Sequence, residues 1–160
     1  MAPGPGALLV QLTRRSGTLA VPRKENTGVS KVDTVKDLYG AFAQGDVPTV
    51  LAAMSPEIEW REAEGNPYQP SGAAWVGGDA IVENLFMKLG SEWEGFAIHP
   101  ERFHDAGETV VVEGRYSGKC IATGIDADVQ YCHVFTFEND KLARFQQFTD
   151  TAQFQKAMGQ

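Results

Sequence analysis

The chain has 160 residues, 42% hydrophobic and 22% charged, which suits one globular domain with its own core. Its net charge of −7 disfavours nucleic acid as a partner, because an acidic surface repels phosphates. No apolar run is long enough to span a membrane, so we expect no membrane partner. Cys120 and Cys132 fit neither a zinc motif nor a disulfide framework and are interpreted as reduced cysteines of a cytoplasmic protein. A turn centred on Asp126 would nevertheless place them opposite each other across a hairpin.

Residues 1–30 differ in composition from the rest of the chain. They carry a net charge of +3, which leaves −10 on residues 31–160. Gly, Pro, Ser and Thr are frequent there, and the apolar stretch 7–10 is too short for a signal peptide. We expect residues 1–30 to form a disordered or loosely docked extension, and residues 31–160 to form the folded domain.

Three helices are predicted early in the domain. Ser30, followed by Asp33, resembles a capping box at the start of a helix that ends at Gly45. Asp46 caps a second, short helix that ends before Pro56. A third helix begins at Asp79 and is expected to end at Gly90.

The remaining elements are strands and one short helix. Residues 58–63 alternate as a strand, and a loop rich in Pro and Gly follows it to residue 78. Four long strands are predicted over 93–104, 109–120, 129–138 and 142–149, joined by short turns that imply an antiparallel meander. A last helix covers 152–158. The fold class is therefore α+β, with a cone-shaped, curved antiparallel sheet wrapped by three N-terminal helices around a hollow.

Four local strings occur in an order and spacing that resemble a known superfamily. They are LYGAFAQGD (38–46), IEWRE (58–62), HVFTF (133–137) and FQQFTDTA (145–152). With the element order, they are similar to the nuclear transport factor 2-like superfamily, which includes ketosteroid isomerases and SnoaL-like polyketide cyclases. The resemblance covers residues 31–160 and implies the nuclear transport factor 2-like, cystatin-like fold and a homodimer. The superfamily also includes binding modules without activity, so the fold alone does not decide the function.

Glu62 is the first candidate catalytic residue. It shares a strand face with Ile58 and Trp60, and such an apolar setting raises the pKa of a carboxyl and suits it to proton abstraction. By the resemblance, it lies where ketosteroid isomerases have their aspartate base, although Glu is one methylene longer than Asp. The alternative is that Glu62 lies at a rim and pairs with an arginine.

His133 is the second candidate, on a strand face shared with Tyr131 and Phe135. By the resemblance, it occupies the position of the protonated aspartic acid that donates to an oxyanion in ketosteroid isomerases. A ring N–H could donate in its place, or the ring could transfer a proton near neutral pH. The alternative is a core histidine bonded to a neighbouring group.

Asp150 and Tyr39 are weaker catalytic candidates. SnoaL-like cyclases have an acid/base aspartate near Asp150, but an Asp before a short helix is also a good N-cap, and we favour the cap. Ketosteroid isomerases have an oxyanion tyrosine on the first helix. The aligned position here is Leu38, one residue or about 100° away from Tyr39, so a packing tyrosine is favoured.

The expected pocket would be lined by aromatic side chains and one amide. Gln147 shares a strand face with Phe145 and must find a hydrogen-bond partner or a ligand. His99 and His104 lie five residues apart on one predicted strand and hence on opposite faces, so we expect no metal site. The candidate substrate-binding residues are Trp60, Tyr68, Trp75, Phe86, Tyr116, Tyr131, Phe135, Phe145 and Gln147.

The leading hypothesis is a cofactor-independent acid/base enzyme, an isomerase, cyclase or related lyase, that acts on a small apolar carbonyl compound. Glu62 or Asp150 would move a proton on the carbon next to the carbonyl, and His133 would stabilise the enolate oxygen. The first alternative is a small-molecule binding or dimerisation module without activity. A second is an epoxide-hydrolase-like activation of water, which would need an inward-pointing arginine.

Overall fold

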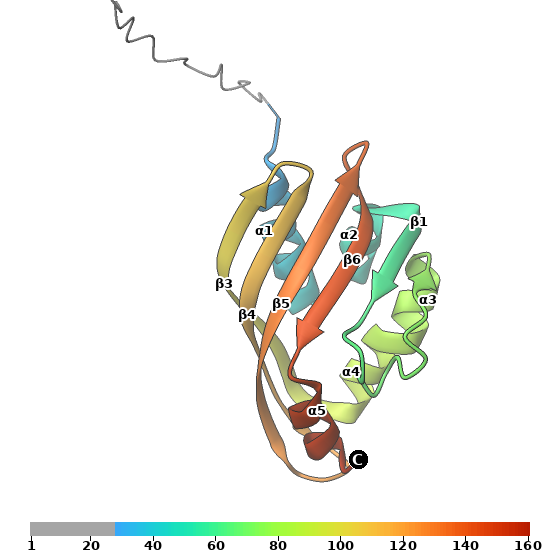
Figure 1. The fold of residues 1–160 in the computed structure, drawn as a ribbon, viewed down its shortest axis with the longest axis vertical. Helices are drawn as coiled ribbons and strands as arrows, with labels where there is room; N and C mark the ends of the chain where they lie inside the picture. Colours follow the sequence, from blue (N-terminus) through green and yellow to red (C-terminus); the bar gives the residue numbers. More distant parts are fainter. Residues whose placement is uncertain (1–27) are drawn as a thin grey trace, which may run out of the picture.

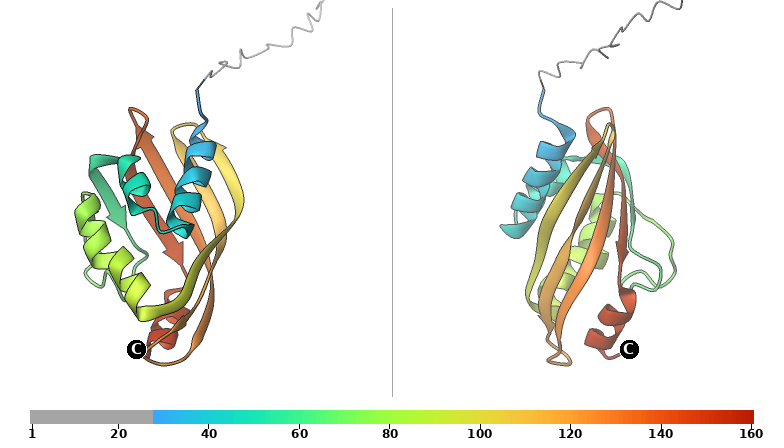
Figure 2. Two further views of the ribbon diagram at one scale, coloured as in Figure 1. Left: turned by 180° about the vertical axis from the view of Figure 1, so that it is seen from behind. Right: turned by 60° about the vertical axis from the view of Figure 1, so that its left-hand side comes forward.

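The protein is described by a computed structural model of residues 28–160, so the predicted extension lies almost wholly outside the described residues. A curved six-stranded sheet runs the length of the molecule, and the helices α1, α2 and α4 lie behind it in the view of Figure 1. Seen from the other side, the same helices lie in front of the sheet (Figure 2). We call this covered side the inner face. The predicted α+β class is confirmed.

The first two helices begin where their capping residues predict. In α1 (Lys31–Ala43), the side chain of Ser30 accepts a hydrogen bond of 3.0 Å from the backbone N–H of Asp33. In α2 (Val47–Ala52), Asp46 accepts one of 3.2 Å from the backbone N–H of Thr49. These bonds satisfy backbone donors that a helix start leaves free.

The third helical segment is longer and less regular than the sequence predicts. It consists of α3 (Gly78–Ile81), a π-helical turn η1 (Val82–Phe86) and α4 (Met87–Glu92) in direct succession. The predicted end at Gly90 is wrong, because the helix continues to Glu92. A π-turn changes which side chains face inward, and such turns are frequent at functional sites.

The strands form one mixed sheet in the order β2-β1-β6-β5-β4-β3. They are β1 (Met54–Arg61), β2 (Trp75–Val76), β3 (Trp93–Ala106), β4 (Thr109–Cys120), β5 (Asp126–Glu138) and β6 (Lys141–Thr149). The four long strands form the predicted antiparallel meander, and β1 adds to it beside β6 in parallel. The short edge strand β2 was not predicted.

The inner face of the sheet carries the core. In β5, buried and more exposed residues alternate over the whole strand, and the buried ones include Tyr131, His133 and Phe135. The helix α5 (Thr151–Met158) covers the lower end of the sheet, where Phe154 is buried (Figure 1). No helix within residues 28–160 combines the length and apolarity that crossing a membrane requires.

An irregularity in β3 corrects the predicted placement of its histidines. The pairing with β4 shifts between Pro100 and Arg102, so the alternation of faces is interrupted there. His99 bonds the hydroxyl of Ser117 at 2.7 Å, and His104 bonds Glu113 at 2.9 Å. Both partners lie on the outer face of β4, so the two histidines share a face, contrary to the prediction.

The two cysteines are free and do not face each other across the hairpin. The backbone N–H of Cys120 bonds the carbonyl of Ile125, so the turn lies between these two residues rather than around Asp126. Cys132 is paired with Glu113 in the adjacent strand. The turn centred on Asp126 that would have placed the two cysteines opposite each other is therefore not formed.

Close packing around Gly114 leads to a first prediction. The hydroxyl of Tyr131 lies over this glycine, and a Cβ added there would meet it at 2.5 Å and would press on the backbone carbonyl of His99. We expect Gly114→Ala to lower the free energy of unfolding by about 1–3 kcal/mol in urea titrations, because the backbone of β3 must move. Gly40→Ala is the control, since a Cβ there meets nothing within 4 Å. Equal stability of the wild type and Gly114→Ala would contradict this packing.

Candidate functional site

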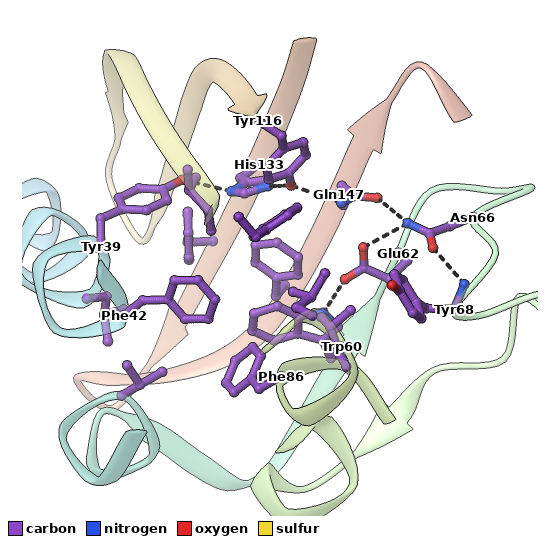
Figure 3. A pocket seen from close by; sticks show the side chains of 18 of the residues that line it. Tyr39, Phe42, Trp60, Glu62, Asn66, Tyr68, Phe86, Tyr116, His133 and Gln147 are labelled. Atoms are coloured by element: carbon purple, nitrogen blue, oxygen red, sulfur yellow. Dashed lines mark hydrogen bonds between the residues drawn. The ribbon is translucent and has the colours of Figure 1, made fainter. Parts of the chain in front are cut away.

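A largely aromatic cavity lies between the inner face of the sheet and the helices (Figure 3). Its volume is about 80 Å³, several times the roughly 10–15 Å³ that one water molecule requires. Most of the predicted wall residues line it, namely Trp60, Tyr68, Phe86, Tyr116, Phe135, Phe145 and Gln147. Glu62, His133 and Tyr39 line it too.

Glu62 contributes the carboxyl group of this cavity. It directly follows β1, and its side chain points inward with only 6% of the residue exposed. One carboxyl oxygen accepts a hydrogen bond of 2.6 Å from the indole N–H of Trp60. The other accepts one of 3.1 Å from the amide of Asn66. Both donors are neutral, so no positive charge compensates the carboxylate.

This environment shifts the pKa of Glu62 upward. Burial removes water from the charged form and raises the pKa to about 7, although the hydrogen bond from Trp60 acts in the opposite direction. A carboxyl with a pKa near neutrality is an effective general base or acid at physiological pH. The predicted apolar setting of Glu62 is therefore present, and the rim position paired with arginine is not.

Two residues that sequence reasoning missed hold Glu62 in place. Gln69 accepts a 2.9 Å hydrogen bond from the backbone N–H of Glu62 and donates one of 3.2 Å to the carbonyl of Trp60. Asn66 accepts a 2.9 Å bond from the backbone N–H of Tyr68, which fixes the direction of its amide. Both residues are 3% exposed. Their only signal in the sequence was polarity within a loop, where it is expected.

His133 lies between two tyrosines. Its Nδ1 is 2.8 Å from the hydroxyl of Tyr39, and its Nε2 is hydrogen-bonded to the hydroxyl of Tyr116. Burial lowers the pKa of His133 to about 3, because a charged ring would lose its hydration. The ring is therefore neutral at physiological pH, which makes a transfer of protons through an imidazolium unfavourable.

A chain of hydrogen bonds connects His133 with Glu62. Gln147 donates to the hydroxyl of Tyr116 at 2.9 Å, and its amide oxygen accepts from Asn66 at 3.0 Å. The same amide nitrogen of Asn66 donates to Glu62. Figure 3 shows the unbroken path from Tyr39 through the histidine to the carboxyl. The partner that the amide of Gln147 was expected to need is thus a protein group.

Three other predicted site residues lie outside the cavity lining. Asp150 caps α5 by accepting a hydrogen bond from the backbone N–H of Gln153, so the structure supports the cap. Trp75 belongs to the edge strand β2. Tyr131 is buried and stacks on His133 with ring centroids 3.9 Å apart, but it supports the ring from behind the cavity. Trp75 and Tyr131, which were predicted in the pocket wall, are therefore not part of it, and the favoured interpretation of Asp150 as a helix cap is the one observed.

Tyr68 closes the cavity from the loop between β1 and β2. Its hydroxyl donates to Glu92 at 2.7 Å and accepts from the indole N–H of Trp93 at 2.8 Å. These bonds attach the loop to the end of α4 and the start of β3. Tyr68 therefore anchors the loop that carries Asn66 and Gln69, the two residues that bind Glu62.

Among the described residues, the lining of the cavity carries little charge and no permanently positive side chain. Within residues 28–160, it includes one ionisable carboxyl and one histidine, but neither lysine nor arginine. An anionic ligand would meet Glu62 without any compensating positive charge. The cavity is therefore suited to a small, mostly apolar molecule that can accept hydrogen bonds.

The sequence was compared with models of known protein families. A model of the SnoaL-like domain matches residues 35–145. The chain belongs to the SnoaL-like family. No match was found among curated proteins. The family and the fold support an activity of the isomerase or cyclase class, and the suspected membership in the nuclear transport factor 2-like superfamily is confirmed.

Solved structures agree with this SnoaL-like assignment. A nuclear transport factor 2-like protein from Burkholderia thailandensis E264 is 36% identical, with a TM-score of 0.76 over 82% of this chain and 98% of that one. One of unknown function from Burkholderia pseudomallei K96243 is 28% identical, with a TM-score of 0.71 over 79% and 95%. TerC, co-crystallised with polyporic acid, is 24% identical, with a TM-score of 0.71 over 81% and 98%, and shares the fold.

Proposed function

We propose that this SnoaL-like protein is a cofactor-independent acid/base enzyme, an isomerase, cyclase or related lyase, that acts on a small neutral carbonyl compound. The observation that carries the proposal is the buried carboxyl of Glu62, with its pKa of about 7, in one aromatic cavity with Tyr39 and Tyr116. A base and hydrogen-bond donors at opposite ends of an apolar site are what enolisation of a carbonyl compound requires.

The proposed reaction begins with Glu62 as the base. Its carboxylate takes the proton from the carbon next to the carbonyl, and the electrons of the broken C–H bond form an enolate. A phenol hydroxyl of Tyr39 or Tyr116 donates a hydrogen bond to the enolate oxygen. Protonated Glu62 then returns the proton to another carbon in an isomerisation, or the enolate carbon attacks a second carbonyl of the same molecule in a cyclisation.

His133 has a different role in this proposal from the one that the sequence predicted. Both of its ring nitrogens already bind tyrosine hydroxyls, so neither is available to an enolate oxygen. The histidine therefore acts through Tyr39 and Tyr116, which line the cavity and whose hydroxyls bond its ring (Figure 3). Asp150 is not proposed as a base, because it caps α5.

A small neutral ligand is supported by two observations. The cavity walls are mostly aromatic, and the lining within the described residues has no positive charge to bind an anion. A structural relative, TerC, was co-crystallised with polyporic acid, which supports small-molecule binding by this fold. An epoxide-hydrolase-like reaction is disfavoured, since no arginine of residues 28–160 lines the cavity.

The proposal is tested by exchange of carbon-bound protons. Small neutral ketones, such as 2-tetralone and cyclohexenone, are incubated with the protein in D₂O, and loss of the α-proton signals is followed by NMR. We expect exchange faster than in buffer for at least one ketone. Ketones that bind in the cavity without accelerated exchange would support a binding module instead.

The pH dependence of this exchange gives a second prediction. The rate should rise with pH through the pKa of Glu62, about 7, because only the carboxylate accepts a proton. Trp60→Phe removes the indole donor that lowers this pKa, so the midpoint should move upward by about one pH unit. Trp75→Phe, outside the cavity, is the control. An unchanged midpoint in Trp60→Phe would contradict the role of Glu62 as the base.

We also propose a homodimer, as the family resemblance implies. Phe148 on the outer face of β6 is 56% exposed and lies opposite Cys132 of β5. The helices α1, α2 and α4 leave this face of the sheet uncovered (Figure 1), so an exposed aromatic side chain on it is available for contact with a second copy. Light scattering of the purified protein should give twice the mass of the chain, and a monomer at micromolar concentration would contradict this.

A further inference from the structure

The hydrogen bonds around His133 limit which group donates and which accepts in each bond. A neutral imidazole has one N–H donor and one nitrogen that accepts. Each ring nitrogen of His133 faces a phenol hydroxyl, which can do either. The tautomer of His133 therefore decides which of Tyr39 and Tyr116 keeps a hydroxyl proton free for a ligand.

The direction of the hydrogen bonds is fixed at the end of the network that lies toward Glu62. The amide oxygen of Gln147 accepts from the backbone N–H of Ala63 at 3.2 Å, and a backbone N–H can only donate. The nitrogen of Gln147 must therefore face Tyr116 and donate to its oxygen. In the same way, the backbone N–H of Tyr68 fixes the amide of Asn66, whose nitrogen faces Gln147.

Two arrangements then remain. In the first, Tyr116 donates to Nε2 of His133, Nδ1–H donates to Tyr39, and the proton of Tyr39 is free. In the second, every bond around the ring is reversed and the proton of Tyr116 is free. Each arrangement leaves the proton of one of these two tyrosines, Tyr39 or Tyr116, without a bond to the ring of His133.

Burial favours the first arrangement. The whole of Tyr116 is 4% exposed, and its oxygen already has two hydrogen-bond partners. Tyr39 is half-buried on α1, and its oxygen bonds His133 and also contacts the hydroxyl of Tyr131. A hydroxyl proton without a partner is most costly in the more buried position. The first arrangement also aligns all donors in one direction, so that each bond strengthens the next.

We infer that His133 is a positioning residue, fixed as the neutral tautomer with its proton on Nδ1, and that it makes Tyr39 the single phenol donor to a ligand oxygen. Its donor strength is set through Gln147 and Tyr116, which polarise the ring from the far side. The inference rests on the proposed function only in identifying that oxygen as the enolate oxygen. The groups packed on the ring are aromatic, with Tyr131 stacked on it and Phe145 edge-on at 4.9 Å.

The tautomer is measured directly by ¹⁵N NMR of protein labelled at histidine, without any substrate. Spectra of His99→Gln and His104→Gln assign the remaining signal to His133. We expect a protonated Nδ1 and an unprotonated Nε2 at neutral pH. A protonated Nε2, or a ring with protons on both nitrogens, would overturn the inference. This result is independent of turnover, so it stands apart from a failure of the exchange assay.

A pair of substitutions tests the positioning role. The amide of Asn lies near the position of Nδ1 and that of Gln near Nε2, so His133→Asn keeps a donor to Tyr39 and His133→Gln does not. The probe is 2-tetralone, a neutral ketone, whose binding is followed by the quenching of tryptophan fluorescence, since Trp60 lines the cavity. We expect Tyr39→Phe and His133→Gln to weaken its binding about tenfold or more, and His133→Asn to stay within about threefold of the wild type. Equal losses in both His133 variants, or stronger binding to His133→Gln, would contradict the inference.

Discussion

Replacing Glu62 by glutamine should slow the exchange of α-protons about 10²- to 10⁴-fold, the usual contribution of a general base. The amide has nearly the shape of the carboxyl but does not accept a proton from carbon. The loss should appear in the rate at saturating ketone, with little change in the concentration that gives half the maximum. NMR exchange rates over a range of ketone concentrations separate the two effects.

A matched control is available two residues further along the chain. Glu64 is exposed, so Glu64→Gln removes the same charge without touching the cavity and should leave the exchange rate unchanged. Thermal unfolding of both variants verifies that each is folded. Wild-type exchange in folded Glu62→Gln would eliminate Glu62 as the base and, with it, the proposed mechanism.

The fold was largely predictable because its signals are local. Capping side chains such as Ser30 and Asp46 act within a few residues, and the alternation in residues 126–138 depends only on which face of β5 is buried. The family resemblance added the order of the elements. Features set by distant contacts were missed, such as the parallel pairing of β1 with β6 and the edge strand β2.

Irregularities within a strand also depend on distant contacts, and they changed the predicted positions of single residues. Counting by twos placed His99 and His104 on opposite faces, but one shift in the pairing near Pro100 put them on the same face. The shift lies where Gly114 lets the hydroxyl of Tyr131 approach the neighbouring strand. Such a fit depends on three strands at once, so no single stretch of sequence contains it.

The candidate site was predictable in its residue types but not in its connections. Alternation correctly indicated that Glu62 and His133 face inward. Alignment favoured Leu38 over Tyr39 as a site residue, whereas both line the cavity and Tyr39 bonds the histidine. The link through Gln147 joins residues 84 positions apart, as in its bond to Ala63. Only the folded loop and sheet bring these groups together.

The buried carboxyl also predicts how stability depends on pH. The folded protein raises the pKa of Glu62 from its ordinary 4.5 to about 7, so the folded state binds this proton more tightly than the unfolded state. Unfolding therefore releases a proton between these two values. The free energy of unfolding should fall as pH rises from 4.5 to about 7 and then stay level, a loss of about 3 kcal/mol from this group.

Glu62→Gln isolates this effect, because glutamine does not titrate. His133 acts in the opposite direction: its pKa is lowered to about 3, so it costs stability as pH falls below its ordinary 6.5. That contribution is common to both proteins and cancels when they are compared. Urea unfolding at pH 4.5 and about pH 8 should therefore show that the wild type loses about 3 kcal/mol relative to the variant across this interval. Parallel pH profiles would mean that Glu62 titrates alike in the folded and unfolded chain, and that its burial does not prepare it to act as a base near neutral pH.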